Sequence, residues 1–251
     1  MMRAIAGATA VLILVAAAAF TFDRSVRGQE PPEPGSVERG EALYEVGCQV
    51  CHGPAGGGVE PWPSILEAGE AAADFQLRTG RMPHTGGPNQ QALPKPPAYD
   101  EQEIRDLVAF VGSISDGPEI PDVEPNDVLL QRGYELFAVN CAPCHGSTGN
   151  GGAVGAGAIA WPIAGAEPRI VGEAMLSGPG QMPVFDLPPE EIDAVATYVR
   201  YLGSAPDPGG FAIGGIGPVP EGFVAWLAGM GALVVIVVLV GRPWTRKDDH
   251  P

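Results

Sequence analysis

An internal repeat limits the folds open to this chain of 251 residues. Residues 39–53 (RGEALYEVGCQVCHG) align with residues 132–146 (RGYELFAVNCAPCHG) at an offset of 93, and 8 of the 15 positions are identical. Further matches follow in the same order: 62–63 with 161–162, 79–83 with 180–183, and 100–114 with 188–202. The chain is therefore predicted to contain two copies of one unit of roughly 90 residues.

Each copy is predicted to consist of helices and loops. A first helix runs up to the cysteines, a short middle helix follows, and a terminal helix ends the unit. The expected ranges are 36–46, 71–78 and 100–114 in the first copy and 125–140, 167–177 and 188–202 in the second. Ser36 and Asn126 are expected to cap the first helices. Apolar residues recur at helical spacing and no segment alternates with a period of two, so the fold class is all-α.

The repeat also sets the expected domain organisation. Domain 1 covers residues 36–115 and domain 2 covers residues 125–203, with a short acidic linker that contains proline at 116–124. A tether rich in Gly and Pro occupies residues 204–222.

Two apolar runs frame these domains. Residues 4–22 follow Arg3, so residues 1–27 are either a signal peptide, with a cleavage point after Ala19, or an N-terminal anchor. Residues 223–241 are predicted to form a transmembrane helix. Three basic residues lie in the tail at 242–251, and Trp226 and Trp244 lie near opposite ends of the run. The positive-inside tendency places this tail in the cytoplasm and both domains outside it, at the cell membrane.

The segment between the apolar ends is strongly acidic. Residues 28–222 contain 8 Lys and Arg against 27 Asp and Glu, a formal charge of 8 − 27 = −19. Nucleic-acid binding is excluded as the main activity, because neutralising phosphates needs clustered basic side chains. The acidic surface fits either electrostatic docking to a basic partner or solubility alone.

All four cysteines lie in Cys-x-x-Cys-His motifs, which are Cys48, Cys51 and His52 in the first copy and Cys141, Cys144 and His145 in the second. This spacing is the attachment signature of c-type haem: two thiols reach the two vinyl groups of one porphyrin, and the histidine reaches the iron. A four-ligand zinc site fits the cysteine count but leaves the histidines unexplained, and a dithiol pair needs neither histidine nor duplication. The chain is predicted to bind two haem c groups covalently.

Each copy offers one methionine as the second axial ligand. Met82 and Met182 both lie in Gly-x-Met-Pro, 30 and 37 residues after the motif histidines. A thioether suits low-spin iron, and His/Met ligation raises the reduction potential. Met175 is the competitor in the second copy, but it lies on the middle helix and has no counterpart in the first. His84 is the competitor in the first copy and is interpreted as a loop residue.

Two Trp-Pro pairs and one arginine are candidates to support the haems. Trp62-Pro63 and Trp161-Pro162 can each offer a carbonyl to the axial histidine and an indole N–H to a propionate, or can simply line the haem pocket. Arg81, beside Met82, is the candidate for a propionate partner, although the second copy has Gln181 there. Arg39 and Arg132 are expected to serve as capping or surface residues.

With these motifs and helices, each half resembles a class I cytochrome c domain. The whole chain is similar to the dihaem cytochrome c subunit of the actinobacterial cytochrome bc1 complex. The resemblance rests on the repeated motifs, on TGRMP and EAMLSGPGQMPVF, and above all on GGFAIGGIGPVPEGFVAWLAGMG before and within the apolar run. It implies an electron-transfer subunit that accompanies cytochrome b and takes electrons from the Rieske iron–sulfur protein. It also implies transfer onward to the copper centre of an aa3-type oxidase, in a supercomplex that oxidises menaquinol.

Six-coordinate irons offer no open position to a substrate, so catalysis would belong to the complex, a quinol–cytochrome c reductase, and the chain would have no catalytic residue of its own. A free-standing anchored dihaem cytochrome that serves another extracytoplasmic oxidoreductase fits the repeat equally well. A dihaem peroxidase needs an iron that loses its sixth ligand, and the paired Met-Pro loops argue against it.

Overall fold

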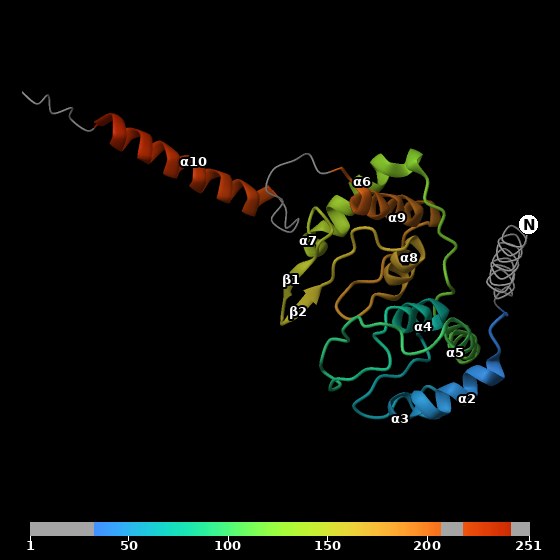
Figure 1. Cartoon of the computed structure of the whole chain (residues 1–251). Coiled ribbons are helices and arrows are strands. Elements are labelled where there is room, and N and C mark those ends of the chain that lie inside the picture. The colour runs from blue at the N-terminus through green and yellow to red at the C-terminus, as the bar shows by residue number, and fades with distance from the viewer. Residues whose placement is uncertain (1–32, 207–217, 242–251) are drawn as a thin grey trace, which may run out of the picture.

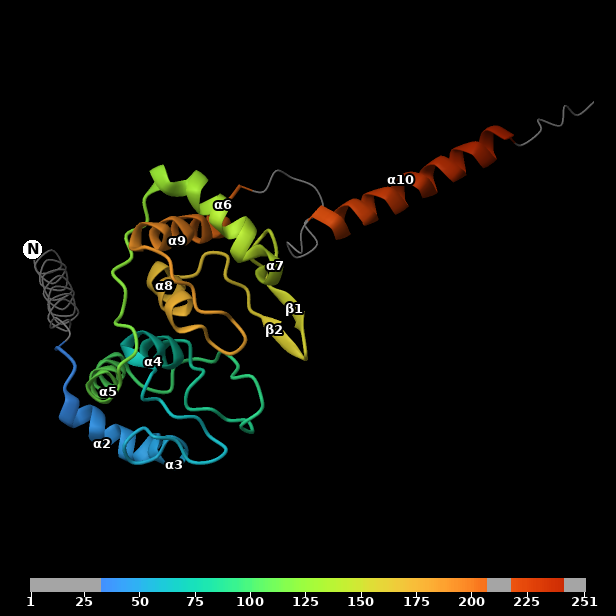
Figure 2. The same ribbon diagram turned by 180° about the vertical axis from the view of Figure 1, so that it is seen from behind.

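The computed structural model describes residues 33–206 and 218–241. Two helical domains follow one another along the chain, and helix α10 (Pro218–Gly241) stands apart from them in both views (Figures 1 and 2). The predicted segment at 1–27, most of the tether and the tail at 242–251 lie outside the described residues.

Domain 1 contains four helices, α2 (Val37–Gly47), α3 (Gln49–His52), α4 (Gly69–Arg78) and α5 (Glu101–Ile114). As predicted, Ser36 caps α2, and its side chain accepts a hydrogen bond from the backbone of Arg39. Asp100 and Glu103 form a reciprocal capping box at the start of α5, which satisfies backbone donors that the helix leaves free. The middle helix α4 begins two residues before the predicted start.

The first and last helices of domain 1 cross at a glycine. A Cβ atom on Gly40 would collide with the backbone carbonyl of Asp106 in α5, so only glycine lets α2 approach this closely. One turn further along α2, the buried Tyr44 ring lies against Phe110, with ring centroids 5.0 Å apart. Around this crossing the core of domain 1 is assembled from the apolar faces of α2, α4 and α5.

Domain 2 repeats this arrangement with η1 (Asp127–Leu129), α6 (Leu130–Asn140), α7 (Ala142–His145), α8 (Pro168–Ser177) and α9 (Pro189–Ser204). Gly133 of α6 lies under the backbone of Ala194, and Phe137 packs on Tyr198 at 5.1 Å. The prediction of one continuous helix over 125–140 is wrong in its first turn. Asn126 does act as a cap, but it accepts a hydrogen bond from Val128 and starts a 3-10 turn before the α-helix begins.

A short hairpin in domain 2 departs from the all-helical prediction. Strands β1 (Gly152–Gly155) and β2 (Ala158–Ala160) pair antiparallel, and Ala156 and Gly157 between them both have positive φ. Two residues of positive φ suit the right-handed twist of a hairpin. Both strands consist mostly of glycine and alanine, so period-two alternation has too few large side chains to be visible. The fold is otherwise helical, as predicted.

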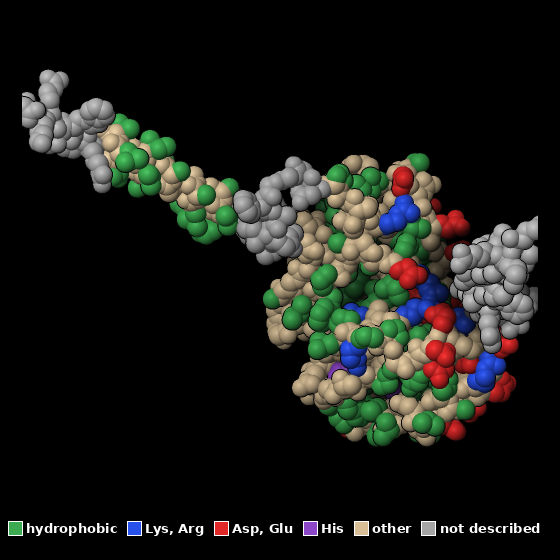
Figure 3. Space-filling model, in the orientation of Figure 1, with side chains coloured by type: hydrophobic (Ala, Val, Ile, Leu, Met, Phe, Trp, Pro, Cys, Tyr) green, Lys and Arg blue, Asp and Glu red, His purple; other side chains and the backbone are tan. Residues whose placement is uncertain are grey.

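The two domains meet where α4 packs against α8 (Figure 1). Among the described residues, one helix is long and apolar enough to cross a membrane, which is α10 over residues 222–241. Its mean hydropathy is 2.8, and none of its apolar window is buried against the rest of the protein. Figure 3 shows hydrophobic side chains around this helix.

Candidate haem sites

Each Cys-x-x-Cys-His motif forms a short helix at the end of the first helix of its domain. Cys48 ends α2 and precedes α3, and its carbonyl accepts hydrogen bonds from the backbones of Cys51 (3.1 Å) and His52 (3.0 Å). The carbonyl of Cys141 binds Cys144 and His145 in the same way at 3.1 and 2.8 Å. A single helical turn places the two thiols of a motif on one side of the helix, as attachment to one porphyrin requires.

The two motif histidines make matching hydrogen bonds. Nδ1 of His52 lies 2.9 Å from the carbonyl oxygen of Pro63, and Nδ1 of His145 lies 2.9 Å from the carbonyl oxygen of Trp161. A carbonyl only accepts, so Nδ1 carries the proton and Nε2 presents its lone pair. Burial lowers the pKa of His145, which favours the neutral form that binds a metal. Both Trp-Pro segments therefore supply a carbonyl that orients the motif histidine, as the surroundings of a metal ligand commonly do.

Cys48 and Cys141, the first cysteine of each motif, have the wrong environment for thiolate chemistry. Burial raises the pKa of Cys141 to about 11 and is also the main cause that raises the pKa of Cys48. A dithiol redox pair needs a lowered thiol pKa instead. Within the described ranges, which contain all four cysteines, no group of three or more His, Cys, Asp or Glu side chains gathers as a zinc site would.

The two Gly-x-Met-Pro methionines lie at the edges of the two cores. Met82 is partly buried against the core of domain 1, and Met182 against that of domain 2. The backbone N–H of Met82 donates to Gln76 at the end of α4, and that of Met182 donates to Pro179. Met175, by contrast, lies on α8 with its side chain in the core of domain 2, where it is 2% exposed. The middle helix of each domain therefore leads directly into the loop that carries the predicted sixth ligand.

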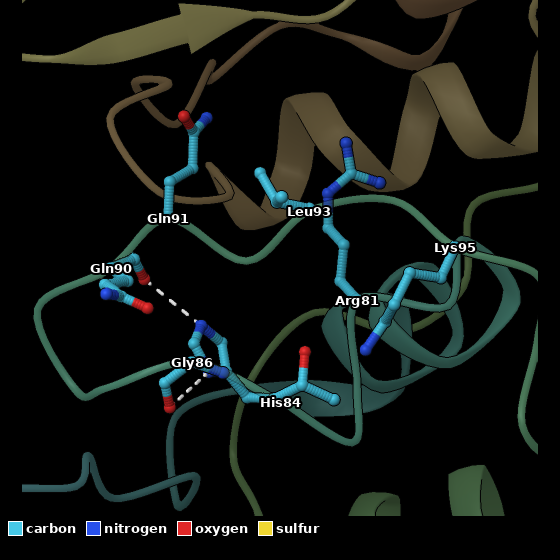
Figure 4. Close-up of a pocket in the computed structure, with 8 residues that line it drawn as sticks. Arg81, His84, Gly86, Gln90, Gln91, Leu93 and Lys95 are labelled. Atoms are coloured by element: carbon cyan, nitrogen blue, oxygen red, sulfur yellow. Dashed lines mark hydrogen bonds between the residues drawn. The ribbon is translucent and has the colours of Figure 1, made fainter.

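A cavity with cationic side chains in its lining is formed by the loops around Arg81. It has a volume of about 190 Å³ and is lined by residues that include Arg81, His84 and Lys95 (Figure 4). The Arg81 guanidinium lies 4.7 Å from the centroid of the Phe75 ring, and no described carboxylate forms an ion pair with it. Burial lowers the pKa of Arg81. A half-buried cation without a described counter-ion fits an anionic propionate better than a surface role.

His84 is committed to its own loop. Its Nδ1 accepts a hydrogen bond from the backbone N–H of Gly86 at 2.9 Å, and its Nε2 lies 3.1 Å from the carbonyl of Gln90 (Figure 4). Neither ring nitrogen is left for a metal, which agrees with its interpretation as a loop residue. Lys95, which sequence reasoning missed, donates to the carbonyl of Pro83 at 3.0 Å. Its only signal in the sequence is that it is the one lysine of the acidic segment.

The indole N–H of Trp161 gives an independent test of whether a haem fits domain 2. Its Nε1 is buried and has no hydrogen-bond partner among the described atoms, although a buried indole N–H usually finds one. Trp62 instead meets His84 edge-on, with centroids 6.0 Å apart. The paired thiols and oriented histidines of both domains fit a haem, and in domain 2 the unpartnered indole N–H of Trp161 fits one as well.

Comparison with known proteins agrees with this arrangement. The family model for cytochrome c matches residues 37–115, and the model for subunit III of cbb3-type cytochrome c oxidase matches residues 128–199. The cytochrome bc1 complex cytochrome c subunit of Mycobacterium tuberculosis (strain H37Rv) is 36% identical over 252 residues, with 92% of this chain and 89% of the relative covered. The chain belongs to this family of cytochrome c subunits.

A second member of the family, from Corynebacterium diphtheriae, is 33% identical over 95% of this chain and 94% of its own length. Among solved structures, cytochrome c4 from Pseudomonas stutzeri is 20% identical, with a TM-score of 0.27 over 66% of this chain and 98% of that one. Cytochrome c domains imply covalently bound haem c, the cofactor that the Cys-x-x-Cys-His spacing predicts.

Proposed function

We propose that this chain is the dihaem electron-transfer subunit of a menaquinol-oxidising cytochrome bc1 complex. It stands beside cytochrome b, takes electrons from the Rieske iron–sulfur subunit and passes them through two haems towards the copper centre of an aa3-type oxidase. The observation that carries the proposal is the matched pair of histidine–carbonyl hydrogen bonds, at 2.9 Å in both domains, in a chain of the cytochrome c subunit family.

The chain's residues hold and insulate a redox centre in each domain. Cys48 and Cys51, and their counterparts in domain 2, would hold the porphyrin through thioether bonds, so the haem would stay attached to the chain. Haem, when bound, supplies a one-electron couple. Met82 and Met182 would each supply a thioether as the second protein ligand, which would leave no open position for a substrate at either iron. The chain then has no catalytic site of its own, and quinol oxidation takes place on other subunits.

The orientation of the membrane anchor determines on which side of the membrane the two haem domains lie. Helix α10 is apolar over residues 222–241. The basic residues of the 242–251 segment follow it, which by the positive-inside tendency places the C-terminus in the cytoplasm. The two domains are then extracytoplasmic, where c-type haems exchange electrons with partner domains.

Purification of the tagged chain in mild detergent tests the assignment to a complex. We expect two haem c per chain, together with b-type haem and a Rieske signal in the same fraction. Elution with c-type haem alone, repeated after mild cross-linking, would identify a free-standing anchored carrier instead. A high-spin ferric signal with peroxide turnover would identify a dihaem peroxidase.

Salt dependence distinguishes two ways in which the acidic surface serves this function. A permanently assembled complex keeps its electron-transfer rate as ionic strength rises, whereas docking of a separate basic partner is screened. The rate is measured by stopped-flow mixing of the purified complex with quinol at increasing salt.

A further inference from the structure

Two carboxyl groups meet inside the contact between the domains. Asp74 is the sixth residue of α4 and Glu173 is the sixth residue of α8, so they occupy equivalent positions in the repeat. They are 1% and 0% exposed. Figure 3 shows acidic and basic side chains gathered where these helices meet. A buried pair of acids that the haem sites do not use calls for its own explanation.

Arginines from both domains hold this pair. Asp74 accepts hydrogen bonds from Nε of Arg78 at 2.7 Å and, across the interface, from Nη2 of Arg169 at 2.5 Å. The remaining nitrogens of Arg78 bind Glu101 of α5 at 2.6 and 2.7 Å. Arg169 therefore links the domains at this contact, because it lies on α8 and binds the acid of α4.

Glu173 lacks what an ionised buried carboxylate needs. Nε of Arg169 lies 3.2 Å from its Oε1, yet neither carboxyl oxygen receives a hydrogen bond among the described atoms. Burial, with Asp74 as the next cause, raises the pKa of Glu173 to about 9. A proton on Glu173 gives it a donor for Asp74 and removes the repulsion between two carboxylates.

The groups that face Glu173 come from two helices. Asp74 and Arg78 face it from α4, and Arg169 lies one turn before it on α8. The linker against α8 contributes the apolar Pro121 and Val123, close to Gly172. Helix α9, which also packs against α8, buries no charged side chain: its buried residues are Ile192, Ala194, Val195, Ala196, Thr197 and Val199.

A second contact joins the domains at a separate place. The side-chain amide of Gln91 donates to the carbonyl of Ile159 at 2.9 Å and accepts from its backbone N–H at 3.1 Å. This pair of bonds fastens the long loop of domain 1 to strand β2 of domain 2. Two separate points of attachment resist rotation of one domain against the other, which a single contact permits.

We propose that Asp74 and Glu173 share one proton across the interface, and that this pair, held by Arg78 and Arg169, positions the two domains for electron transfer between their haems. The inference rests on the proposed function. Its physical basis is that α4 and α8 lead into the loops of Met82 and Met182. A fixed α4–α8 contact therefore fixes the relative placement of both redox centres. The four residues are positioning residues.

Infrared spectroscopy of the full haem-loaded chain in detergent tests the shared proton. At pH 7 we expect the wild-type protein to show the carbonyl stretch of a protonated carboxyl, shifted in deuterium oxide and lost in Glu173→Gln. Glu167→Gln is the matched control, because it removes an acid from the exposed start of the same helix. Identical spectra for wild type and Glu173→Gln would overturn the shared proton.

Pulsed electron paramagnetic resonance between the two ferric haems tests the positioning. Arg169→Gln is expected to broaden the distribution of haem–haem distances and to slow electron exchange between the haems. Arg200→Gln, which removes an exposed ion pair with Asp127, is expected to change neither. Above about pH 9 the wild-type distribution should broaden while that of Glu173→Gln stays narrow.

Unchanged distances in Arg169→Gln, or the same pH profile in wild type and Glu173→Gln, would overturn the positioning role. Neither measurement depends on quinol. If quinol-driven reduction fails while the infrared and distance results hold, the proposed function is wrong and the carboxyl pair stands. If quinol reduces the haems but the infrared and distance results differ from those expected, only the role of Asp74 and Glu173 is wrong.

Discussion

Arg39 of α2 holds the carboxylate of Asp106 of α5 with two hydrogen bonds, from Nε at 2.7 Å and from Nη2 at 2.8 Å. Asp106 is 2% exposed and also accepts a bond from the backbone N–H of Ser36 at 2.8 Å. The first and last helices of domain 1 are therefore joined by a buried charge beside the Gly40 crossing. In domain 2 Ala194 stands at the position of Asp106, and Arg132 binds Glu191 one turn earlier on α9, so both arginines still join the first helix to the last.

Acid should loosen domain 1 through this bond. The hydrogen bond from Arg39 is the main cause that lowers the pKa of Asp106 from 3.8 to about 2. A lowered pKa means stability that is present above pH 4 and lost as pH falls towards 2. We expect the melting temperature of the wild-type protein to fall over this pH range. The melting temperature of Asp106→Asn should be lower than that of the wild type at pH 7 and should change less with pH. Equal slopes for the two proteins would contradict the role of this carboxylate.

A methyl group at the helix crossing should destabilise domain 1. In Gly40→Ala the new Cβ collides with the backbone of Asp106, and overpacking of this kind costs about 1–3 kcal/mol against a gain of ~1 kcal/mol in helix propensity. Gly57→Ala is the control, since nothing lies within 4 Å of its Cβ. Thermal unfolding of the haem-loaded protein measures both. A Gly40→Ala protein as stable as Gly57→Ala would contradict the close approach.

Replacing either predicted axial methionine should change one haem and spare the other. Met82→Ala and Met182→Ala are each expected to convert one of the two irons to high spin and to lower its reduction potential, because the thioether raises the potential. Met175→Leu, within the core of α8, should leave both irons low-spin. Electron paramagnetic resonance and a redox titration measure the outcome. High-spin iron in Met175→Leu, with Met182→Ala unchanged, would reverse the assignment in domain 2.

Neutralising the cation beside Met82 should lower the potential of the haem in domain 1 alone. In Arg81→Gln a positive charge that favours the reduced iron is lost, whereas Arg81→Lys keeps the charge. Domain 2 has Gln181 at this position, so its haem provides the internal control. Redox titration resolves the two centres. An unchanged reduction potential in Arg81→Gln would show that the charge of Arg81 has no effect on the haem of domain 1.

The helices and motifs were predictable from the sequence because local signals determine them. Ser36 and Asp100 cap their helices with their own side chains, and the repeat shows the same order of elements twice. Each motif histidine meets a carbonyl of its Trp-Pro pair, that of Pro63 in domain 1 and that of Trp161 in domain 2, and the sequence does not show which of the two residues accepts. The roles of Met82 and Met182 as ligands stay predictions.

Contacts between distant segments were not predictable in the same way. Periodicity shows that Asp74 and Glu173 lie on helices, but not that these faces meet another domain. The β1–β2 hairpin was missed because glycine and alanine dominate it. The 3-10 turn before α6 depends on one side-chain bond of Asn126, which the helical pattern does not reveal.

Electron transfer from quinol through both haems is tested most directly by anaerobic reduction of the purified complex with menaquinol. The reduction is followed in the absorption band of c-type haem. We expect two haem c equivalents per chain to become reduced, and an inhibitor of the Rieske pathway to prevent both reductions. If only one equivalent is reducible, or if c-type haem stays oxidised while b-type haem is reduced, the chain is not the two-haem electron path of this complex.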